Sequence, residues 1–564
     1  MGKQAYGRSL GDFGDLLPAE KRLLACCRCG VFSEICYVRP EKEEDYNKIR
    51  AQFLRFLILG GDDENPVHEK GVQLKGGWIA GELDLRGGIS ASRIFLLDCV
   101  FKQKPNFTDA VIKGGVWLNG SHMPGLRADR LKTDGSVQLG EGFKSVGEVR
   151  LGGAKIGGQL SFSEATFEAV GSGDALNVDG IVVGGDVFFD EGFTATGEVR
   201  LAGAKIGGDL SFRESIFKAE SNGKKSEKYA LVAERIQVDG SVFLQKNFNA
   251  EGDVSFYSTK IGGNLNLIGE KISIKEKLNL EGVDVKGSFL LVGCNPPIEN
   301  ILLSGAHVGM LEDDVRSWGK NLNLHHFIYD KISDKSSMNA EIRIAWLEKQ
   351  DAKLLGGVKG SVLAPQPWLR LKKVFKESGY YEEAKKVGIA FEKKRTFQKE
   401  QFVDSCLHKL YGLFTAYGYK PSRLMWISFF VWLLCFGFYA ITAHEGEFAP
   451  SDMNVVCGYY KGCAPDVVKA ASAMPKPDWL NGSILPPEYA NFHPLVYSLN
   501  VLVPVLDLQQ ESAWSPVVPA NKGLFTSLGG WAQILVWVET CYGWLAGAML
   551  LTVLSGLTRT QEEE

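Results

Sequence analysis

At 564 residues the chain is too long for a single hydrophobic core, so two or three structural units are expected. Its formal net charge of −4 excludes a strongly basic protein that binds nucleic acid over its whole surface, and no nucleic-acid partner is predicted. The 65 glycines are concentrated in the first half of the chain, which indicates that the units differ in architecture.

The N-terminal region, residues 1–66, is predicted to be a helical cap. It lacks the apolar segment of a signal peptide and matches a myristoylation signal poorly, so the bulk of the chain is expected in the cytosol. Residues 43–60 place four apolar side chains on one helical face, where they would cover the first coil of the next region. These side chains are Ile49, Phe53, Phe56 and Leu57.

Residues 67–310 contain internal repeats. The segment GEVRLGGAKIGGQLSFSEATFEA (147–169) recurs as GEVRLAGAKIGGDLSFRESIFKA (197–219) and more loosely at 252–273. Apolar residues alternate as in strands and are interrupted by turns, which predicts a mainly β protein with a parallel β-helix solenoid of about ten coils. We expect positive φ at its glycine-containing turns. These turns are Gly157-Gly158, Gly207-Gly208, Gly262-Gly263, Asp179-Gly180 and Asp239-Gly240.

Residues 311–422 are predicted to be a helical linker. Within it, residues 367–395 form a helical hairpin that Pro367 begins and Ser378-Gly379 turns, similar to a single tetratricopeptide-type pair. The second helix is rich in Lys and Arg. Two interpretations remain open, because these bases either face an anionic membrane surface or form an ordinary solvated face.

Residues 423–564 are predicted to be a membrane domain. Two segments, about 424–443 and 531–557, are long and apolar enough to cross a bilayer as helices. Bases precede the first segment, and Arg559 follows the second. The positive-inside rule therefore predicts that both termini are cytoplasmic and that the intervening loop lies outside.

The loop between the two apolar segments holds the candidate functional residues. Its apolar stretch, 495–508, is interrupted by Pro504 and would either enter the bilayer as a short re-entrant helix or lie outside as an interfacial helix. In the second case, Glu539 would be hydrogen-bonded between packed helices. Ionisable groups within a membrane are costly and usually functional. The candidate pore-lining or membrane-embedded polar residues are His493, Asp507, Glu511 and Glu539.

Cysteine usage fits a cytosolic protein with one external exception. Cys457 and Cys463 lie in the loop placed outside, where they either form a disulfide or remain two unpaired thiols. Near the N-terminus, Cys26 and Cys29 form one CxxC, which is a weak metal signal without a second pair. No metal site is predicted.

Catalytic signatures are missing from the sequence. It has no GxGxxG, P-loop or HExxH motif, and His325-His326 is its only adjacent histidine pair. No aromatic or charged stripe on the repeats is distinct enough to nominate a binding surface. We therefore predict a protein without catalytic, cofactor or metal residues.

The sequence resembles a family of uncharacterised bacterial membrane proteins with a pentapeptide-like β-helix and a two-span tail. The resemblance lies in IRAQFLRFLILGG, GVQLKGGWIAGELDL, the basic hairpin, YGYKPSR and FHPLVYSLNVLVPVLDLQQESAW. Such proteins are often labelled membrane-associated oxidoreductases, a label that no residue here supports. The tail is also distantly similar to the two-helix pore domain of potassium-type channels, with Tyr497-Ser498-Leu499 at the pore helix. No TVGYG-like filter follows, so potassium selectivity is not implied.

Together, these features predict a non-enzymatic protein of the bacterial inner membrane. Its cytosolic β-helix would bind an unknown protein or polymer, and its tail would anchor it in the lipid bilayer. The tail would also open as a pore on homo-oligomerisation, as in a stress or defence effector. The alternatives are a passive membrane-tethered scaffold and a membrane-associated oxidoreductase.

Overall fold

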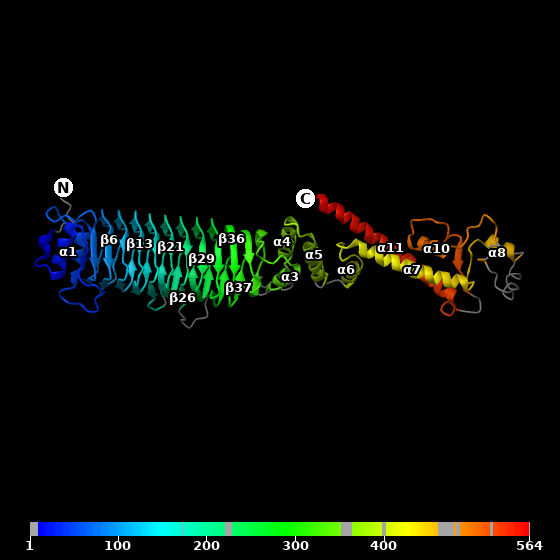
Figure 1. The fold of residues 1–564 in the computed structure, drawn as a ribbon, viewed down its shortest axis with the longest axis horizontal. Helices are drawn as coiled ribbons and strands as arrows, with labels where there is room; N and C mark the ends of the chain where they lie inside the picture. Colours follow the sequence, from blue (N-terminus) through cyan, green and yellow to red (C-terminus); the bar gives the residue numbers. More distant parts are fainter. Residues whose placement is uncertain are drawn as a thin grey trace. The chain divides into compact units, whose positions relative to one another are not determined.

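The computed structural model describes residues 9–171, 173–219, 228–350, 364–396, 402–460, 479–480, 485–518 and 523–562. The chain divides into two compact units, Met1–Gly388 and Ile389–Glu564. The first unit contains the stack of β-strands together with helices α1 and α4 in Figure 1. The second unit contains the long helices α7 and α11.

The first unit is a parallel β-solenoid of about 11 turns, which confirms the predicted fold class. Its strands form a 21-stranded, a 10-stranded and a 9-stranded sheet, and a typical coil gives two strands to the first sheet and one to each of the others. Lys132 pairs with Lys155 and Val137 pairs with Leu160, so residues at equivalent positions of these two successive coils pair with each other. One such coil contains β11 (Leu126–Arg127), β12 (Lys132–Thr133), β13 (Val137–Gln138) and β14 (Lys144–Val146).

Stacked phenylalanines fill the interior of the solenoid. The Phe189 ring lies between Phe162 and Phe212, with ring centroids 4.9 and 5.1 Å apart. A second column packs beside this one, with neighbouring centroids 5.3 to 5.7 Å apart. Each buried ring contributes roughly 1.5–3 kcal/mol of hydrophobic stabilisation, so the columns provide much of the core. The second column is Phe143, Phe167, Phe193, Phe217 and Phe248.

Close packing between coils explains most of the predicted glycine turns. Gly180 has a φ of 65°, as expected, but Gly157 and Gly207 do not have a positive φ. A Cβ on Gly157 would lie 2.4 Å from the carbonyl oxygen of Asp134 in the preceding coil, and one on Gly207 would lie 2.5 Å from that of Gly184. The expectation of positive φ is therefore wrong for the three Gly-Gly pairs and for Gly240, where glycine permits two backbones to approach closely.

The N-terminal cap contributes strands as well as helices. It contains η1 (Leu10–Phe13), α1 (Pro18–Cys29) and α2 (Ala51–Ile58), together with β1 (Ser33–Glu34) and β2 (Lys48–Arg50). These strands pair with β3 (Val72–Lys75) and β4 (Trp78–Ala80), respectively. The predicted helix over 43–60 is thus shorter, and Ile49 lies in β2. The four predicted apolar side chains are all buried.

The solenoid extends beyond the predicted boundary at residue 310. The last strands continue to Ile332, so the predicted helical linker begins too early. The described residues that follow form α3 (Ala340–Leu347), α4 (Pro365–Glu377) and α5 (Tyr381–Thr396), with α4 and α5 joined at the predicted turn. The last strands are β36 (Asp284–Val292), β37 (Ile298–Leu302), β38 (His307–Asp313), β39 (Trp318–Asn323) and β40 (Ile328–Ile332).

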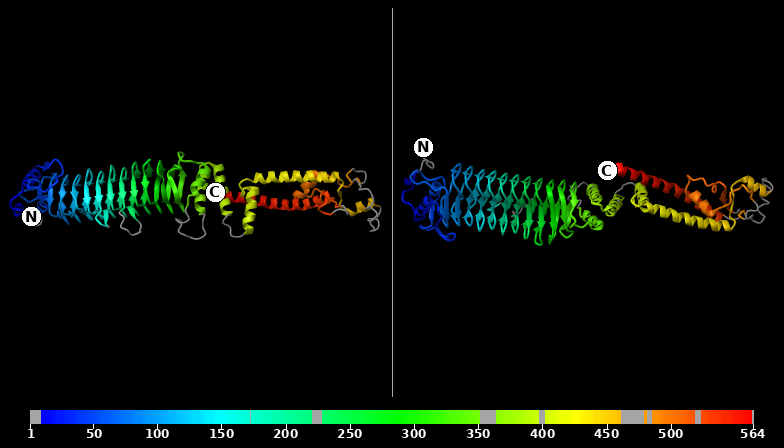
Figure 2. Two further views of the ribbon diagram at one scale, coloured as in Figure 1. Left: turned by 90° about the horizontal axis from the view of Figure 1, so that it is seen from below. Right: turned by 45° about the horizontal axis from the view of Figure 1, so that its top comes forward.

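The second unit is helical. Its described elements are α6 (Phe402–Thr415), α7 (Pro421–His444), α8 (Met453–Tyr459), α10 (Pro494–Leu502), α11 (Leu528–Glu562) and the antiparallel pair β41 (Phe448–Pro450) and β42 (Trp514–Pro516). Helices α7 and α11 run alongside each other, and α10 packs against both (Figure 2).

Two helices of this unit are long and apolar enough to cross a membrane: Pro421–His444 and Leu528–Gly556. They correspond to the two segments predicted from the sequence. Many of their large apolar side chains point away from the protein, an arrangement that suits lipid better than water. Among them are Trp426, Phe430, Leu434, Trp537, Trp544 and Leu551.

Candidate functional site

A buried carboxylate joins the three packed helices of the second unit. Glu539 of α11 is 1% exposed and accepts hydrogen bonds from the Tyr439 hydroxyl of α7 at 2.8 Å and the Ser498 hydroxyl of α10 at 2.5 Å. A polar group buried among apolar side chains requires such partners. Glu539 is therefore held between packed helices, which is one of the two interpretations drawn from the sequence.

Aromatic rings surround one side of this carboxylate. Tyr497 of α10 lies edge-on to Tyr439, with centroids 5.2 Å apart, and Phe448 of β41 is 5.4 Å from Tyr497. Phe492 links this group to Trp514 of β42. Because the rings come from α7, α10 and the β41–β42 pair, they fix the position of α10 relative to α7 and to this strand pair.

Helix α10 reaches the middle of both long helices. The Leu502 carbonyl at its C-terminus lies against Gly543, where a Cβ would be only 2.0 Å from the oxygen. The indole of Trp432 donates a hydrogen bond to the Leu495 carbonyl at 3.2 Å. Gly543 is near the centre of the apolar part of α11, and Trp432 is near the centre of α7. The chain then leaves α10 as irregular backbone at this level.

A side-chain amide organises the irregular segment after α10. Asn500 Nδ2 donates to the Leu506 carbonyl at 2.9 Å, while its Oδ1 accepts the backbone N–H groups of Leu508 and Gln510, each at 3.2 Å. Gln510 in turn accepts the backbone N–H of His493 at 2.9 Å. Sequence analysis missed both amides. The sequence shows only that Asn500 is a polar residue within a mostly apolar stretch, and it does not indicate which backbone groups the amide would bind.

Three of the four candidate residues do not join the Glu539 cluster. His493, Asp507 and Glu511 are exposed on the single chain. Asp507 accepts the backbone N–H of Gln509 at 2.9 Å, and Val505 beside it is 84% exposed. The segment after α10 is thus ordered by internal hydrogen bonds, yet it presents both apolar and acidic side chains outward.

The predicted disulfide is only partly within the described residues. Cys457 of α8 takes part in a disulfide, whereas Cys463, its predicted partner, lies outside the described residues, so the pairing stays a prediction. In the N-terminal cap, the thiols of Cys26, Cys27 and Cys29 are free. Burial raises the pKa of Cys27 to about 12, so this thiol is protonated. Within the described ranges, no group of three or more His, Cys, Asp or Glu side chains could hold a metal ion.

The solenoid surface carries an aromatic stack that sequence analysis did not find. Phe95 of β6 (Ile94–Leu97) and Trp117 of β9 (Val116–Trp117) stack with centroids 4.3 Å apart, and Phe32 lies 5.6 Å from Phe95. Phe95 and Trp117 are register partners on successive coils. The stack was hidden because no repeat relates these residues in the sequence; only the coil register aligns them.

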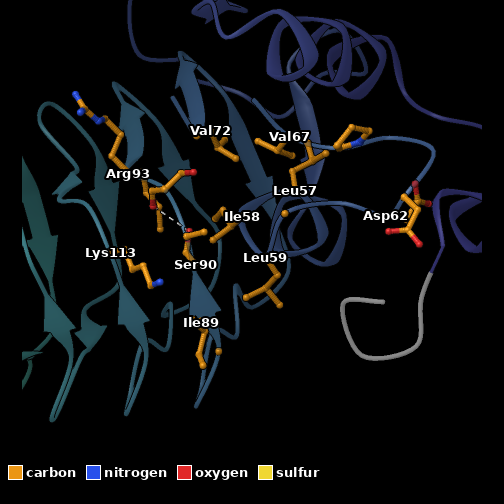
Figure 3. A pocket seen from close by; sticks show the side chains of 18 of the residues that line it. Leu57, Ile58, Leu59, Asp62, Val67, Val72, Ile89, Ser90, Arg93 and Lys113 are labelled. Carbon is orange, nitrogen blue, oxygen red and sulfur yellow. Dashed lines mark hydrogen bonds between the residues drawn. The ribbon is translucent and has the colours of Figure 1, made fainter. Parts of the chain in front are cut away.

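A groove of about 850 Å³ lies between the end of α2 and the first coils. Leu57, Ile58 and Leu59 contribute apolar side chains to it, as Figure 3 shows. Arg93 and Lys113 lie on one side of these residues, and Asp62 lies on the other. The groove and the aromatic stack are two features of the first unit that fit a binding surface.

No protein-family model, curated protein or solved structure matched this chain in the comparisons. The resemblances noted from the sequence therefore stay expectations.

Proposed function

We propose that this protein is a non-enzymatic membrane protein that works as a homo-oligomer, in which the segments from α10 to Glu511 of several copies surround a water-filled pore. The observation that supports this proposal is the depth of the irregular backbone. If α7 and α11 cross a bilayer, residues 503–508 follow the Leu502–Gly543 contact and lie near the middle of the membrane.

Irregular backbone at this depth needs protein or water around it. In hydrocarbon, each unsatisfied backbone group costs several kcal/mol, so such segments are tolerated only when they are buried in protein or line a water-filled cavity. A charged Asp507 side chain facing lipid would add a further cost. The exposed Val505 and Asp507 are therefore expected to meet other copies of the chain and water, respectively.

The orientation of the assembly follows from charge. Lys420 precedes α7 and Arg423 lies in its first turn, and the positive-inside rule places both in the cytoplasm, with both termini on the same side. The membrane would be the inner membrane of a bacterium. The solenoid would then act in the cytosol as the receptor for a protein or polymer, and the Phe95–Trp117 stack is a surface that suits this role. A stress or defence effector is one protein class that combines such a receptor with a pore.

The test is conductance of the full-length protein in planar bilayers, combined with its oligomeric state in detergent. We expect an oligomer with cation-preferring currents, and we expect Asp507→Asn to reduce the cation current severalfold. Glu488→Gln, at another exposed acid of the same loop, is the matched control and should leave the current unchanged. A monomer, or an electrically silent oligomer, would contradict the pore.

A passive membrane-tethered scaffold is the second candidate. The hydrogen bonds of Glu539 favour this role. A carboxylate whose two oxygens accept hydrogen bonds from Tyr439 and Ser498 holds the helices together and needs no further partner. An electrically silent protein would support this role. A bound flavin or haem in the absorbance spectrum of purified protein would instead favour a membrane-associated oxidoreductase.

A further inference from the structure

Helix α6 has its apolar side chains on its exposed face. Leu407, Leu410 and Leu413 are 54%, 38% and 54% exposed. Residues three apart in a helix lie on one face, so these side chains form a continuous leucine row. In a soluble protein such a row would pack against the core.

The chain itself covers the side of α6 that carries His408 and Gly412. Nε2 of His408 lies 3.2 Å from a carboxylate oxygen of Glu392 in the last turn of α5, and the Tyr417 ring is 4.9 Å from the His408 ring. A Cβ on Gly412 would be only 2.4 Å from the Tyr417 ring, so this face is closely packed. The helix thus packs the side with His408 and Gly412 against the chain and leaves its three leucines exposed, an arrangement that is unfavourable in water and favourable beside lipid.

The leucine row lies next to the start of a membrane-length helix. A tight turn with positive φ at Ala416 and Tyr417 separates α6 from α7, which begins at Pro421. The Phe414 ring of α6 is 6.0 Å from Tyr542 of α11, so α6 is also packed beside the second long helix. Exposed bases, Lys420 and Arg423, follow directly. An apolar face with adjacent bases is typical of helices that lie in the interface of an anionic membrane.

We propose that α6 lies in the membrane interface, with the leucine row at the boundary of the acyl chains and with Lys420 and Arg423 at anionic headgroups. The lipid surface, rather than another protein, covers the row because α6 continues within six residues into a helix that carries its own outward apolar face. This inference rests on the membrane insertion of the proposed function, and it adds a lipid-binding element that couples the linker to the spans.

Photo-crosslinking in the full-length protein tests the leucine row. Benzoylphenylalanine replaces Leu410 in protein reconstituted into nanodiscs of phosphatidylcholine and phosphatidylglycerol, and adducts are identified by mass spectrometry. We expect at least tenfold more lipid adduct from this position than from Ser405 on the opposite face. Adducts to a second copy or to the same chain in place of lipid, or equal lipid labelling at both positions, would overturn the inference.

A third labelling position separates this inference from the proposed function. Phe430 on α7 is 61% exposed and should label lipid wherever α7 crosses the bilayer. Lipid labelling at Phe430 without labelling at Leu410 refutes only the interfacial helix, whereas labelling at neither position refutes membrane insertion itself. For the headgroup contacts, we expect Lys420→Gln with Arg423→Gln to reduce the phosphatidylglycerol share of the Leu410 adducts about threefold. An unchanged share would refute these contacts.

Discussion

Arg343 of α3 and Asp313 of β38 form a bidentate ion pair with both N–O distances at 2.7 Å and both side chains 2% exposed. The indole of Trp318 donates a further hydrogen bond to Asp313 at 2.6 Å. This buried network attaches the first helix after the solenoid to its last coils. It also closes the solenoid end, where unpaired strand groups would otherwise be open to association.

Removal of this arginine should destabilise the solenoid end strongly. Arg343→Leu leaves the Asp313 carboxylate buried without its counterion, which costs about 3–5 kcal/mol. Thermal unfolding of the full-length protein in detergent, followed by circular dichroism, measures the loss. Arg130→Leu is the matched control: its pair with Asp109 has a similar distance of 2.7 Å but is exposed, so a change below about 1 kcal/mol is expected. Similar losses for the two variants would refute the assigned role.

Alanine at a corner glycine should test the close packing between coils. A Cβ on Gly184 would lie 2.4 Å from the Gly157 carbonyl oxygen, so Gly184→Ala should destabilise the solenoid by about 1–3 kcal/mol through overpacking. Gly173→Ala is the control, because its Cβ would meet only the Val170 carbonyl oxygen, at 3.8 Å. Urea midpoints of both variants provide the comparison, and an unchanged midpoint for Gly184→Ala would contradict the packing argument.

The solenoid should lose stability in acid partly through His122. Burial, followed by the nearby Arg39 and Lys144, lowers the pKa of His122 from 6.5 to about 4. Between pH 6.5 and 4, the His122 imidazole is protonated in the unfolded chain but neutral in the folded chain. The contribution of neutral His122 to the free energy of unfolding is therefore fully present above about pH 6.5 and falls as the pH decreases toward 4. His122→Gln should reduce the acid-induced loss between pH 7 and 4.5 by about 1 kcal/mol, since the imidazole is only half-buried and is partly screened. Equal losses for both proteins would show that His122 is not responsible.

Replacement of Glu539 should loosen α10. Glu539→Leu removes the acceptor for two buried hydroxyls, those of Tyr439 and Ser498, and each orphaned hydroxyl costs about 1–3 kcal/mol. Glu539→Gln keeps one acceptor oxygen and should lose less. Thermal unfolding in detergent ranks the two variants. A more stable Glu539→Leu protein would indicate that the carboxylate is retained for function at the expense of stability.

The sequence predicted those parts of the molecule whose signal is local. Period-2 alternation predicted the solenoid, and uninterrupted apolar length predicted α7 and α11, because burial on one face and immersion in lipid each act on contiguous residues. The predicted end of the solenoid at residue 310 was wrong for a related reason. The last coils lack the glycine pairs of the repeats, and their charged strands, such as His307–Asp313, do not look like the coils before them.

Features that depend on contact between distant residues could not be predicted. Glycine is required at a corner because a carbonyl group of the preceding coil lies too close for a Cβ, as the Asp134 carbonyl does at Gly157. The sequence of a single repeat does not reveal that contact. Glu539 was identified as an acid to explain, but its partners lie 100 and 41 residues away. Asn500 was missed because an uncharged amide gains its role only when the following loop folds back onto it.

The Leu502–Gly543 contact gives the most direct test of the re-entrant segment. Gly543→Ala would place a methyl group 2.0 Å from the Leu502 carbonyl oxygen, so α10 must move away from α11. Gly547→Ala, one turn further along α11, meets nothing within 4 Å and should be neutral or stabilising by up to about 1 kcal/mol, because alanine is the better helix former. If α10 positions the pore, Gly543→Ala should reduce conductance at least tenfold while Gly547→Ala keeps it. Equal conductance in the two variants would mean that the pore, if present, is formed without α10.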